Sequence, residues 1–421
     1  MESMAFAAVA TAILGFGLIS GRVQNTIITA PLVFVGFGML LGEHGLGLFT
    51  LHVEDHVIHT LAELTLVLVL FTDATRINLE QLRRQHNLPI RLLAIGMPLT
   101  IVLGTLVAIW LFPELTFWEA ALLAAVLAPT DAALGQAVVS SPKVPVRIRQ
   151  TLNVESGLND GIALPLVLVF LSTCSSAVPG QGGTEYWLKF AALQVTLGPL
   201  IGIAVGLLGS RLVSWGMRSK WMNEAFQHLS TLGLALLSFA GAELIGGNGF
   251  IAAFCAGITL GNTSSCAFES LYEFAEAEGQ LLALLVFLVF GAVLLPGAID
   301  HVTWQYVLYG VLSLTVVRMV PVAISLIGAR LRKETVLFLG WFGPRGIASV
   351  LFGLVVVESS VLHHREEIFF VMIITVALSV IAHGVSAFPG VEWYSAHSET
   401  YDATSGEHQD VAEMPVRIRH A

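Results

Sequence analysis

The stretch Asn153-Val154-Glu155-Ser156-Gly157-Leu158-Asn159-Asp160-Gly161 lies inside an apolar segment, residues 150–172. On a helix, Ser156 and Asp160 share one face, and Glu155 and Asn159 share a second face turned by about 100° from the first. A carboxylate with a hydroxyl one turn away suits a small hard cation, which takes several oxygen ligands. Because a carboxylate that faced lipid would be costly, we expect these groups to face protein or a watery cavity.

The composition around this stretch is that of a membrane protein. The 421 residues are 55% hydrophobic and 12% charged, with a mean hydropathy of +0.80. Soluble domains carry about 25% charged residues, so an ordinary water-facing surface is excluded. We predict an all-α polytopic membrane protein with about 13 transmembrane helices and no large soluble domain. The apolar segments are 4–20, 26–42, 57–72, 91–112, 117–140, 150–172, 187–210, 227–246, 249–262, 279–296, 304–329, 336–357 and 367–388.

The placement of the basic residues predicts the orientation, whereas the net charge of −10 says little. Of the twenty Lys and Arg residues, sixteen lie in the tail or in gaps after odd-numbered segments. Only Lys189, at the start of segment 187–210, and Arg365 lie on the other side. The positive-inside rule therefore puts the C-terminus in the cytoplasm and the N-terminus outside.

Two apolar segments are interrupted at corresponding positions of the two halves. The fifth contains Ala128-Pro129-Thr130-Asp131, and the twelfth contains Gly343-Pro344-Arg345-Gly346. Proline breaks a helical hydrogen bond, and irregular backbone within a membrane is tolerated where it lines a cavity. Paired breaks are typical of transporters built from inverted repeats, so we expect two repeats of six helices whose broken helices cross.

Two basic residues, Arg318 and Arg345, lie within apolar segments. A charge inside a span is a candidate functional group and needs a partner. We predict that Arg318 pairs with Glu155, because Asp160 must stay available to exchange ligands. Arg345 follows a helix break, where it could neutralise the carbonyl end of a half-helix or repel cations.

These motifs resemble the monovalent cation/proton antiporter superfamily, in its sodium/proton exchanger branch. The resemblance spans nearly the whole chain, from Leu70-Phe71-Thr72-Asp73 to Arg345-Gly346. In this family Asn159-Asp160 marks the branch that exchanges one cation for one proton without net charge movement. The family usually has Thr-Asp-Pro in the fifth segment, whereas here the proline precedes Thr130.

The resemblance implies a role for each motif residue. Asp160 resembles the carboxylate that binds either cation or proton, and Thr130, Asp131, Ser156 and Asp73 resemble residues that help to form that site. Glu155 and Arg318 match a structural ion pair, and Asn159 and Arg345 belong to the supporting motifs.

The resemblance also implies a division of the chain. Residues 1–388 are expected to form the transmembrane antiporter domain, with a mobile core of about 91–172 and 304–388. A homodimer is expected to form through about 1–72 and 187–296. Residues 389–421 are polar, and we expect a short, disordered cytoplasmic tail.

These observations predict a transporter that exchanges a monovalent cation for H⁺ by alternating access. The predicted cation is Na⁺, with Li⁺ as a second candidate. We expect the protein to lie in the inner (cell) membrane of a bacterium or archaeon. The ligand types do not distinguish this function from a K⁺/H⁺ antiporter of the same fold. A cation channel or sensor is a rival from another class, and an intramembrane hydrolase would leave Glu155 and Arg318 unexplained.

The sequence points to no cofactor, nucleic-acid partner, enzymatic activity or bound metal beyond the transported cation. The three cysteines have no pair spacing, and no tight His/Cys cluster occurs. The expected partners are the cation, protons, membrane lipid and a second copy of the chain. Seven histidines fall in or near the outside loops, where solvated residues are a simpler interpretation than pH sensing: His44, His52, His56, His59, His301, His363 and His364.

Overall fold

The computed structural model describes most of the chain as helix. It describes residues 2–23, 26–48, 56–77, 79–80, 87–176, 184–263, 269–359, 362–401 and 405–408. Every regular element in these ranges is helical, which confirms the all-α prediction, and no strand occurs in them. Each of the thirteen apolar segments overlaps one or more of these helices.

Two compact units make up the chain, and three helices run from one into the other. The first unit comprises Met1–Ala62, Asn87–Ser156 and Ala283–Ala421, and the second comprises Glu63–His86 and Gly157–Leu282. The continuous helices are α3 (His56–Thr75), α9 (Val146–Ser176) and α13 (Glu269–Val289). The division into a mobile core and a dimerisation domain stays a prediction.

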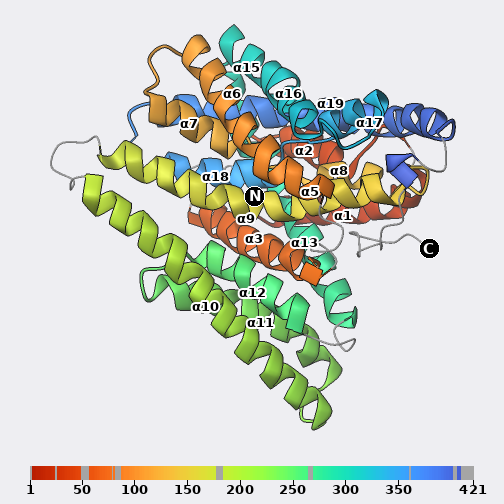
Figure 1. Cartoon of the computed structure of the whole chain (residues 1–421). Coiled ribbons are helices and arrows are strands. Elements are labelled where there is room, and N and C mark those ends of the chain that lie inside the picture. Colours follow the sequence, from red (N-terminus) through yellow and green to blue (C-terminus); the bar gives the residue numbers. More distant parts are fainter. Residues whose placement is uncertain are drawn as a thin grey trace. The chain divides into compact units, whose positions relative to one another are not determined.

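The first unit holds most of the helices (Figure 1). They are α1 (Glu2–Val23), α2 (Ala30–Leu41), α5 (Asn87–Arg91), the π-helical turn η1 (Leu92–Gly96), α6 (Met97–Leu111), α7 (Phe117–Val126), α8 (Ala132–Val139), the π-helical turn η3 (Phe290–Leu294), α14 (Leu295–Ile299), α15 (Trp304–Leu314), α16 (Val316–Ser325), α17 (Lys333–Trp341), α18 (Ile347–Glu358), α19 (Arg365–Ser398) and the short 3₁₀ turn η4 (Gly406–His408).

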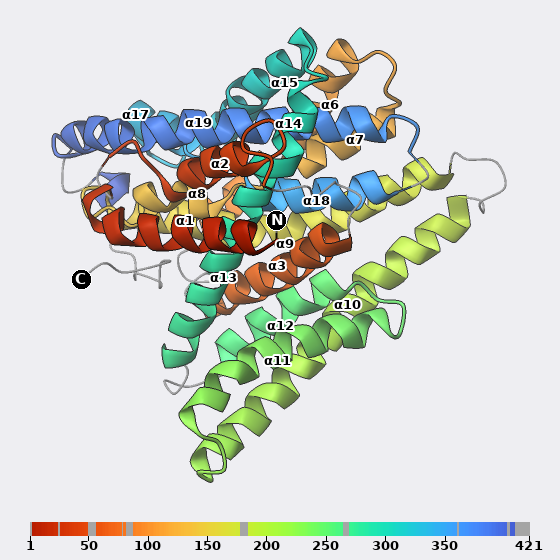
Figure 2. The same ribbon diagram turned by 180° about the vertical axis from the view of Figure 1, so that it is seen from behind.

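The second unit contains α10 (Thr184–Arg218), α11 (Glu224–Glu243) and α12 (Gly249–Thr263), which lie side by side in Figures 1 and 2. The helices α10 and α12 pack closely because three glycines on one face of α10 meet α12. A methyl group at Gly202 would lie 2.2 Å from the Ala252 carbonyl oxygen, and Gly198 and Gly206 repeat the arrangement one turn on either side. Small residues at intervals of four allow this backbone approach in membrane helices.

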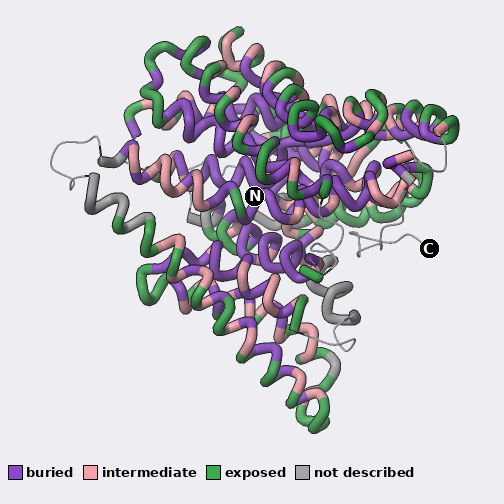
Figure 3. The backbone as a smooth tube through the Cα atoms, in the orientation of Figure 1, coloured by how far each residue is buried: buried purple, intermediate pink, exposed green. Residues whose placement is uncertain are grey.

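Length and composition make many of the helices suited to a membrane. Seven helical stretches among the described residues are long and apolar enough to cross one, and five further apolar helices are 10–17 residues long. In the most apolar part of α19, 67% of the residues are buried, against 22% in α10 and in α11. Figure 3 shows exposed positions along α10 and α11, where leucines form an apolar outer surface. The count of thirteen crossings stays a prediction.

Both predicted helix breaks are present. The backbone is irregular between α7 and α8, at 127–131, and between α17 and α18, at 342–346. The half-helix α7 begins with a capping box, in which Thr116 and Glu119 each accept a hydrogen bond from the other's backbone N–H. Two separate half-helices therefore take the place of each continuous span.

The expected disorder after residue 388 is wrong for part of the tail. Helix α19 continues to Ser398, because Val391 and Tyr394 are buried and Tyr394 stacks on Phe338 with 4.2 Å between ring centroids. Beyond it, the Glu407 side chain is buried and accepts hydrogen bonds from Arg332 N–H at 2.7 Å and from the Thr335 hydroxyl at 2.9 Å. The prediction relied on the polar composition of the whole tail, which does not show that a few of its residues are buried.

Candidate cation site at two crossed helix breaks

The two helix breaks meet at Asp131, which caps two half-helices at once. Its Oδ1 accepts from the backbone N–H of Ala133 (2.7 Å) and Leu134 (3.0 Å) at the start of α8. Its Oδ2 accepts from Ile347 N–H at the start of α18 at 2.6 Å. The Asp131 N–H in turn donates to the Pro344 carbonyl at 2.7 Å. One buried carboxylate thus faces the positive ends of two helix dipoles, and the predicted crossing of the broken helices is confirmed.

Two glycines of the second break allow side chains to approach its backbone. A methyl group at Gly346 would lie 2.1 Å from Asp131 Oδ2, and one at Gly343 would lie 2.4 Å from Arg318 Nε. Any larger residue at either position would displace a charged side chain. The Gly343-Pro344-Arg345-Gly346 motif therefore serves close packing as well as helix breaking.

Arg345 lies at the opposite helix end from Asp131. Its Nη1 donates to the carbonyl oxygens of Ala128 (2.7 Å) and Pro129 (3.1 Å), which follow the C-terminal end of α7. The residue is fully buried. A cation at a helix C-terminus is stabilised by the dipole and satisfies carbonyls that have no helical partner. Of the two roles considered for Arg345, the geometry supports neutralisation of the carbonyl end.

Arg318 of α16 and Glu155 of α9 form the predicted ion pair. The contacts are bidentate, with Nη1–Oε1 at 2.5 Å and Nη2–Oε2 at 2.8 Å. Each side chain is 3% exposed. Because removal of one partner would leave the other charge buried and uncompensated, the pair constrains α9 against α16 beside the second break.

Thr130 and Ser156 lie together, as a shared site requires. Their hydroxyl oxygens are 3.0 Å apart, and both residues are buried. Thr130 comes from the irregular backbone before α8, and Ser156 from α9. The two hydroxyl oxygens join the first break to the helix that carries Asp160.

Asp160, Asn159 and Asp73 belong to the second unit and are buried there. Asp160 follows Ser156 by one turn of the continuous helix α9. The Asp73 carbonyl oxygen lies near Gly157, 3.9 Å from where a methyl group on that glycine would lie, so the end of α3 packs against α9 at this level. The roles of Asp160 and Asp73 as cation ligands stay predictions.

Asp131 differs most from its predicted role. The sequence places it among the cation ligands, whereas both of its oxygens accept backbone hydrogen bonds here. A cation at this carboxylate would share oxygens that already hold two helix ends. A ligand role for Asp131 stays a prediction, and its capping of α8 and α18 is a feature of the fold.

Sequence reasoning missed two residues of α19. Ser379 and His383 are buried, and they contact both the start and the end of the second break. The signal in the sequence was a histidine four residues after a serine inside an apolar segment, a spacing that places both on one helix face.

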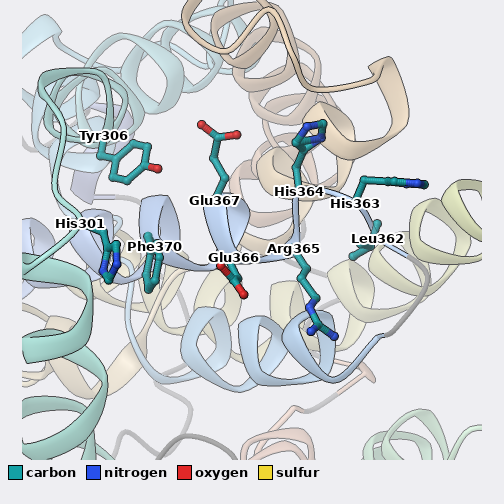
Figure 4. A pocket seen from close by; sticks show the side chains of 9 residues that line it. All are labelled: His301, Tyr306, Leu362, His363, His364, Arg365, Glu366, Glu367 and Phe370. Atoms are coloured by element: carbon teal, nitrogen blue, oxygen red, sulfur yellow. The ribbon is translucent and has the colours of Figure 1, made fainter.

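Three of the histidines that the sequence predicts to lie in or near outside loops, His301, His363 and His364, line one pocket of about 780 Å³, shown in Figure 4. His301 stacks on Phe370 with 4.9 Å between ring centroids, and His364 Nδ1 lies 3.5 Å from Glu119 Oε2. Elsewhere His44 lies 3.3 Å from Asp300, and His52 is outside the described residues. His56 and His59 fall in the first turn of α3. The described residues include no group of three or more His, Cys, Asp or Glu that could hold a metal ion.

Comparison with known proteins agrees with this geometry. The family described as "Sodium/hydrogen exchanger, transmembrane" matches residues 7–393. A K(+)/H(+) antiporter of Alkalimonas amylolytica is 28% identical over 382 residues, covering 89% of this chain and 64% of the relative. A Na(+)/H(+) antiporter of Schizosaccharomyces pombe is 24% identical over 317 residues, covering 67% of this chain and 66% of the relative.

Solved structures share the fold. The sodium proton antiporter MjNhaP1 from Methanocaldococcus jannaschii matches with a TM-score of 0.73 and 20% sequence identity, covering 91% of this chain and all of the other. The K(+)/H(+) antiporters similar to this chain, from Alkalimonas and Shewanella, are longer, and the chain spans between 54% and 64% of their length.

Proposed function

The chain belongs to the sodium/hydrogen exchanger family, which is a family of membrane transporters, and from that premise we propose that it exchanges a monovalent cation for a proton. The observation that carries the proposal is the crossing of two broken helices, held by Asp131 at the N-terminal ends of two half-helices and by Arg345 at the C-terminal end of a third. Paired breaks of this kind surround ion sites in transporters.

In the proposed mechanism one carboxylate binds either ion. Deprotonated Asp160 binds the cation, and Thr130, Ser156 and Asp73 are the residues proposed to assist it. Protonation of Asp160 removes the charge and releases the cation. An empty carboxylate is costly to carry through a low-dielectric barrier, so only the loaded or protonated form crosses. Transport occurs by alternating access and exchanges one cation for one proton, so no net charge crosses the membrane. The Asn159-Asp160 pair supports this stoichiometry.

The proposal extends to the surroundings of the protein. The distribution of Lys and Arg supports a cytoplasmic C-terminus and an outside N-terminus in the inner membrane of a bacterium or archaeon. We propose a homodimer embedded in lipid. The apolar outer surface of α10 and α11 suits contact with lipid or with a second subunit. Neither a cofactor nor a resident metal takes part.

The transported cation is proposed to be Na⁺, with Li⁺ as a second substrate. K⁺ is the alternative with specific support, because the relative from Alkalimonas is named a K(+)/H(+) antiporter. A cation channel would pass ions without coupling to protons, so a pH gradient alone would not drive uptake.

The experiment uses purified protein in vesicles with an acidic interior and a pH-sensitive dye. Addition of Na⁺ or Li⁺ outside is expected to release protons from the vesicles, with a smaller response to K⁺. A response to K⁺ alone would assign the alternative substrate. A response to none of the three cations, or cation uptake that does not depend on the pH gradient, would contradict antiport.

A further inference from the structure

A hydrogen-bonded chain from α19 connects the two ends of the second helix break. Arg345 N–H donates to Ser379 Oγ at 2.7 Å, and Ser379 Oγ lies 3.1 Å from His383 Nδ1. His383 Nε2 lies 2.9 Å from the carbonyl oxygen of Trp341, the last residue of α17. The path therefore begins at Arg345 near the end of the break, passes through two side chains four residues apart, and returns to Trp341, the residue before the break.

The hydrogen-bond partners of the two ring nitrogens determine the protonation of His383. The Trp341 carbonyl only accepts, so Nε2 must carry a proton at this distance. The Ser379 hydroxyl accepts from Arg345 N–H and can donate its own proton to Nδ1. A neutral imidazole protonated on Nε2 satisfies each of these bonds. The opposite tautomer, with Nδ1–H donating to the Ser379 carbonyl at 3.0 Å, would leave two lone pairs facing each other at Nε2.

The surroundings of this chain also favour the neutral form. Ser379 is fully buried and His383 is 1% exposed. The break that they span already holds two guanidinium groups, since Arg345 belongs to it and Arg318 packs against Gly343. A third positive charge at this depth would be costly.

We propose that His383 is a positioning residue for transport, and that with Ser379 it fixes the shape of the α17/α18 break. That shape delivers the Arg345 guanidinium to the carbonyls of Ala128 and Pro129 and the Ile347 N–H to Asp131. Both contacts hold the backbone on either side of Thr130, a proposed cation ligand. Loss of the His383 link therefore loosens the cation site without touching the cation.

The first test measures hydrogen exchange at the amides of 342–347, which requires no transport. His383→Phe removes both polar contacts and is expected to speed exchange at Arg345 and Ile347 about tenfold. His383→Gln keeps a donor and an acceptor on a side chain of similar reach, and it is expected to retain most of the protection. The control is His397 on the same helix, an exposed residue whose ring bonds the Trp393 carbonyl one turn back. His397→Phe is expected to leave exchange unchanged.

The second test separates positioning from a loss of folded protein, and it rests on the proposed function. For His383→Phe the cation concentration at half-maximal rate is expected to rise about fivefold to tenfold, the size expected for the loss of about one buried hydrogen bond. A merely destabilised protein would lose maximal rate at unchanged half-saturation. His383→Gln is expected to restore half-saturation to within about twofold.

Ser379→Ala provides a milder variant if phenylalanine prevents folding. It breaks the same chain of hydrogen bonds, so it is expected to speed hydrogen exchange at 342–347. The double variant Ser379→Ala with His383→Phe should exchange no faster than the more severe single variant. Unchanged exchange in both single variants, a His383→Gln variant as defective as His383→Phe, or fully additive effects would overturn the proposal. If exchange responds as expected while neither the wild-type protein nor any variant transports, the proposed function fails and only the part of the proposal that His383 and Ser379 fix the shape of the α17/α18 break stands.

Discussion

Asp160→Asn is expected to abolish proton-coupled cation transport in vesicles while the protein still folds. The amide cannot take up and release a proton, and it lacks the charge that attracts a cation into a low-dielectric site. Asp160→Glu keeps the carboxylate on a longer side chain, so it is expected to retain part of the activity. The measurement is dye-monitored proton release on addition of Na⁺, with the thermal unfolding of each variant recorded in the same detergent.

The matched control for this change is Asp300→Asn, which removes an aspartate that is 57% exposed and lies beside His44. It is expected to leave transport unchanged. Transport at the wild-type rate by Asp160→Asn would contradict the assignment of Asp160 as the shared site for cation and proton.

Removal of one partner of the Glu155–Arg318 pair is expected to cause the largest loss of stability. Each side chain is 3% exposed, so Glu155→Gln leaves the Arg318 charge buried without its counter-ion. Such a change costs about 3–5 kcal/mol. Thermal unfolding should therefore shift strongly downward, and Arg318→Glu should be worse still because it places two carboxylates together. The double variant Glu155→Arg with Arg318→Glu is expected to recover part of the loss.

The control pair is Lys143 and Glu392, whose side chains are 52% and 43% exposed. Solvent screens that contact, so Glu392→Gln is expected to cost at most about 1 kcal/mol. If Glu155→Gln unfolds at the wild-type temperature, or the charge-swapped double variant is no better than the worse single one, the pair does not stabilise the fold as described.

Local patterns predicted much of this fold. Apolar segments separated by basic loops predicted the helices, and Pro129 and Pro344 marked both breaks, because a proline removes a helical hydrogen bond. Proline alone does not locate a break, since Pro165, Pro199 and Pro321 lie inside helices. The Glu155–Arg318 pair was also predictable. An uncompensated charge in an apolar span is so costly that few arrangements of the available charges remain.

Contacts between distant residues were harder to predict. Asp131 and Ile347 are 216 residues apart, and no local pattern shows that one carboxylate caps both α8 and α18. The same holds for His383, whose partners Trp341 and Arg345 lie on other elements. The prediction of a disordered tail was wrong in part for a different reason. Composition averages over many residues, whereas Tyr394 and Glu407 are single buried positions in a polar stretch.

The central claim is that cation and proton compete for one carboxylate, and the pH dependence of the apparent cation affinity tests it most directly. Proton release from vesicles is measured against Na⁺ concentration at several pH values. With one proton competing for one site, the Na⁺ concentration at half-maximal rate is expected to rise about tenfold for each pH unit below the pH at which Asp160 titrates. A half-maximal concentration that does not change with pH over this range would contradict the claim.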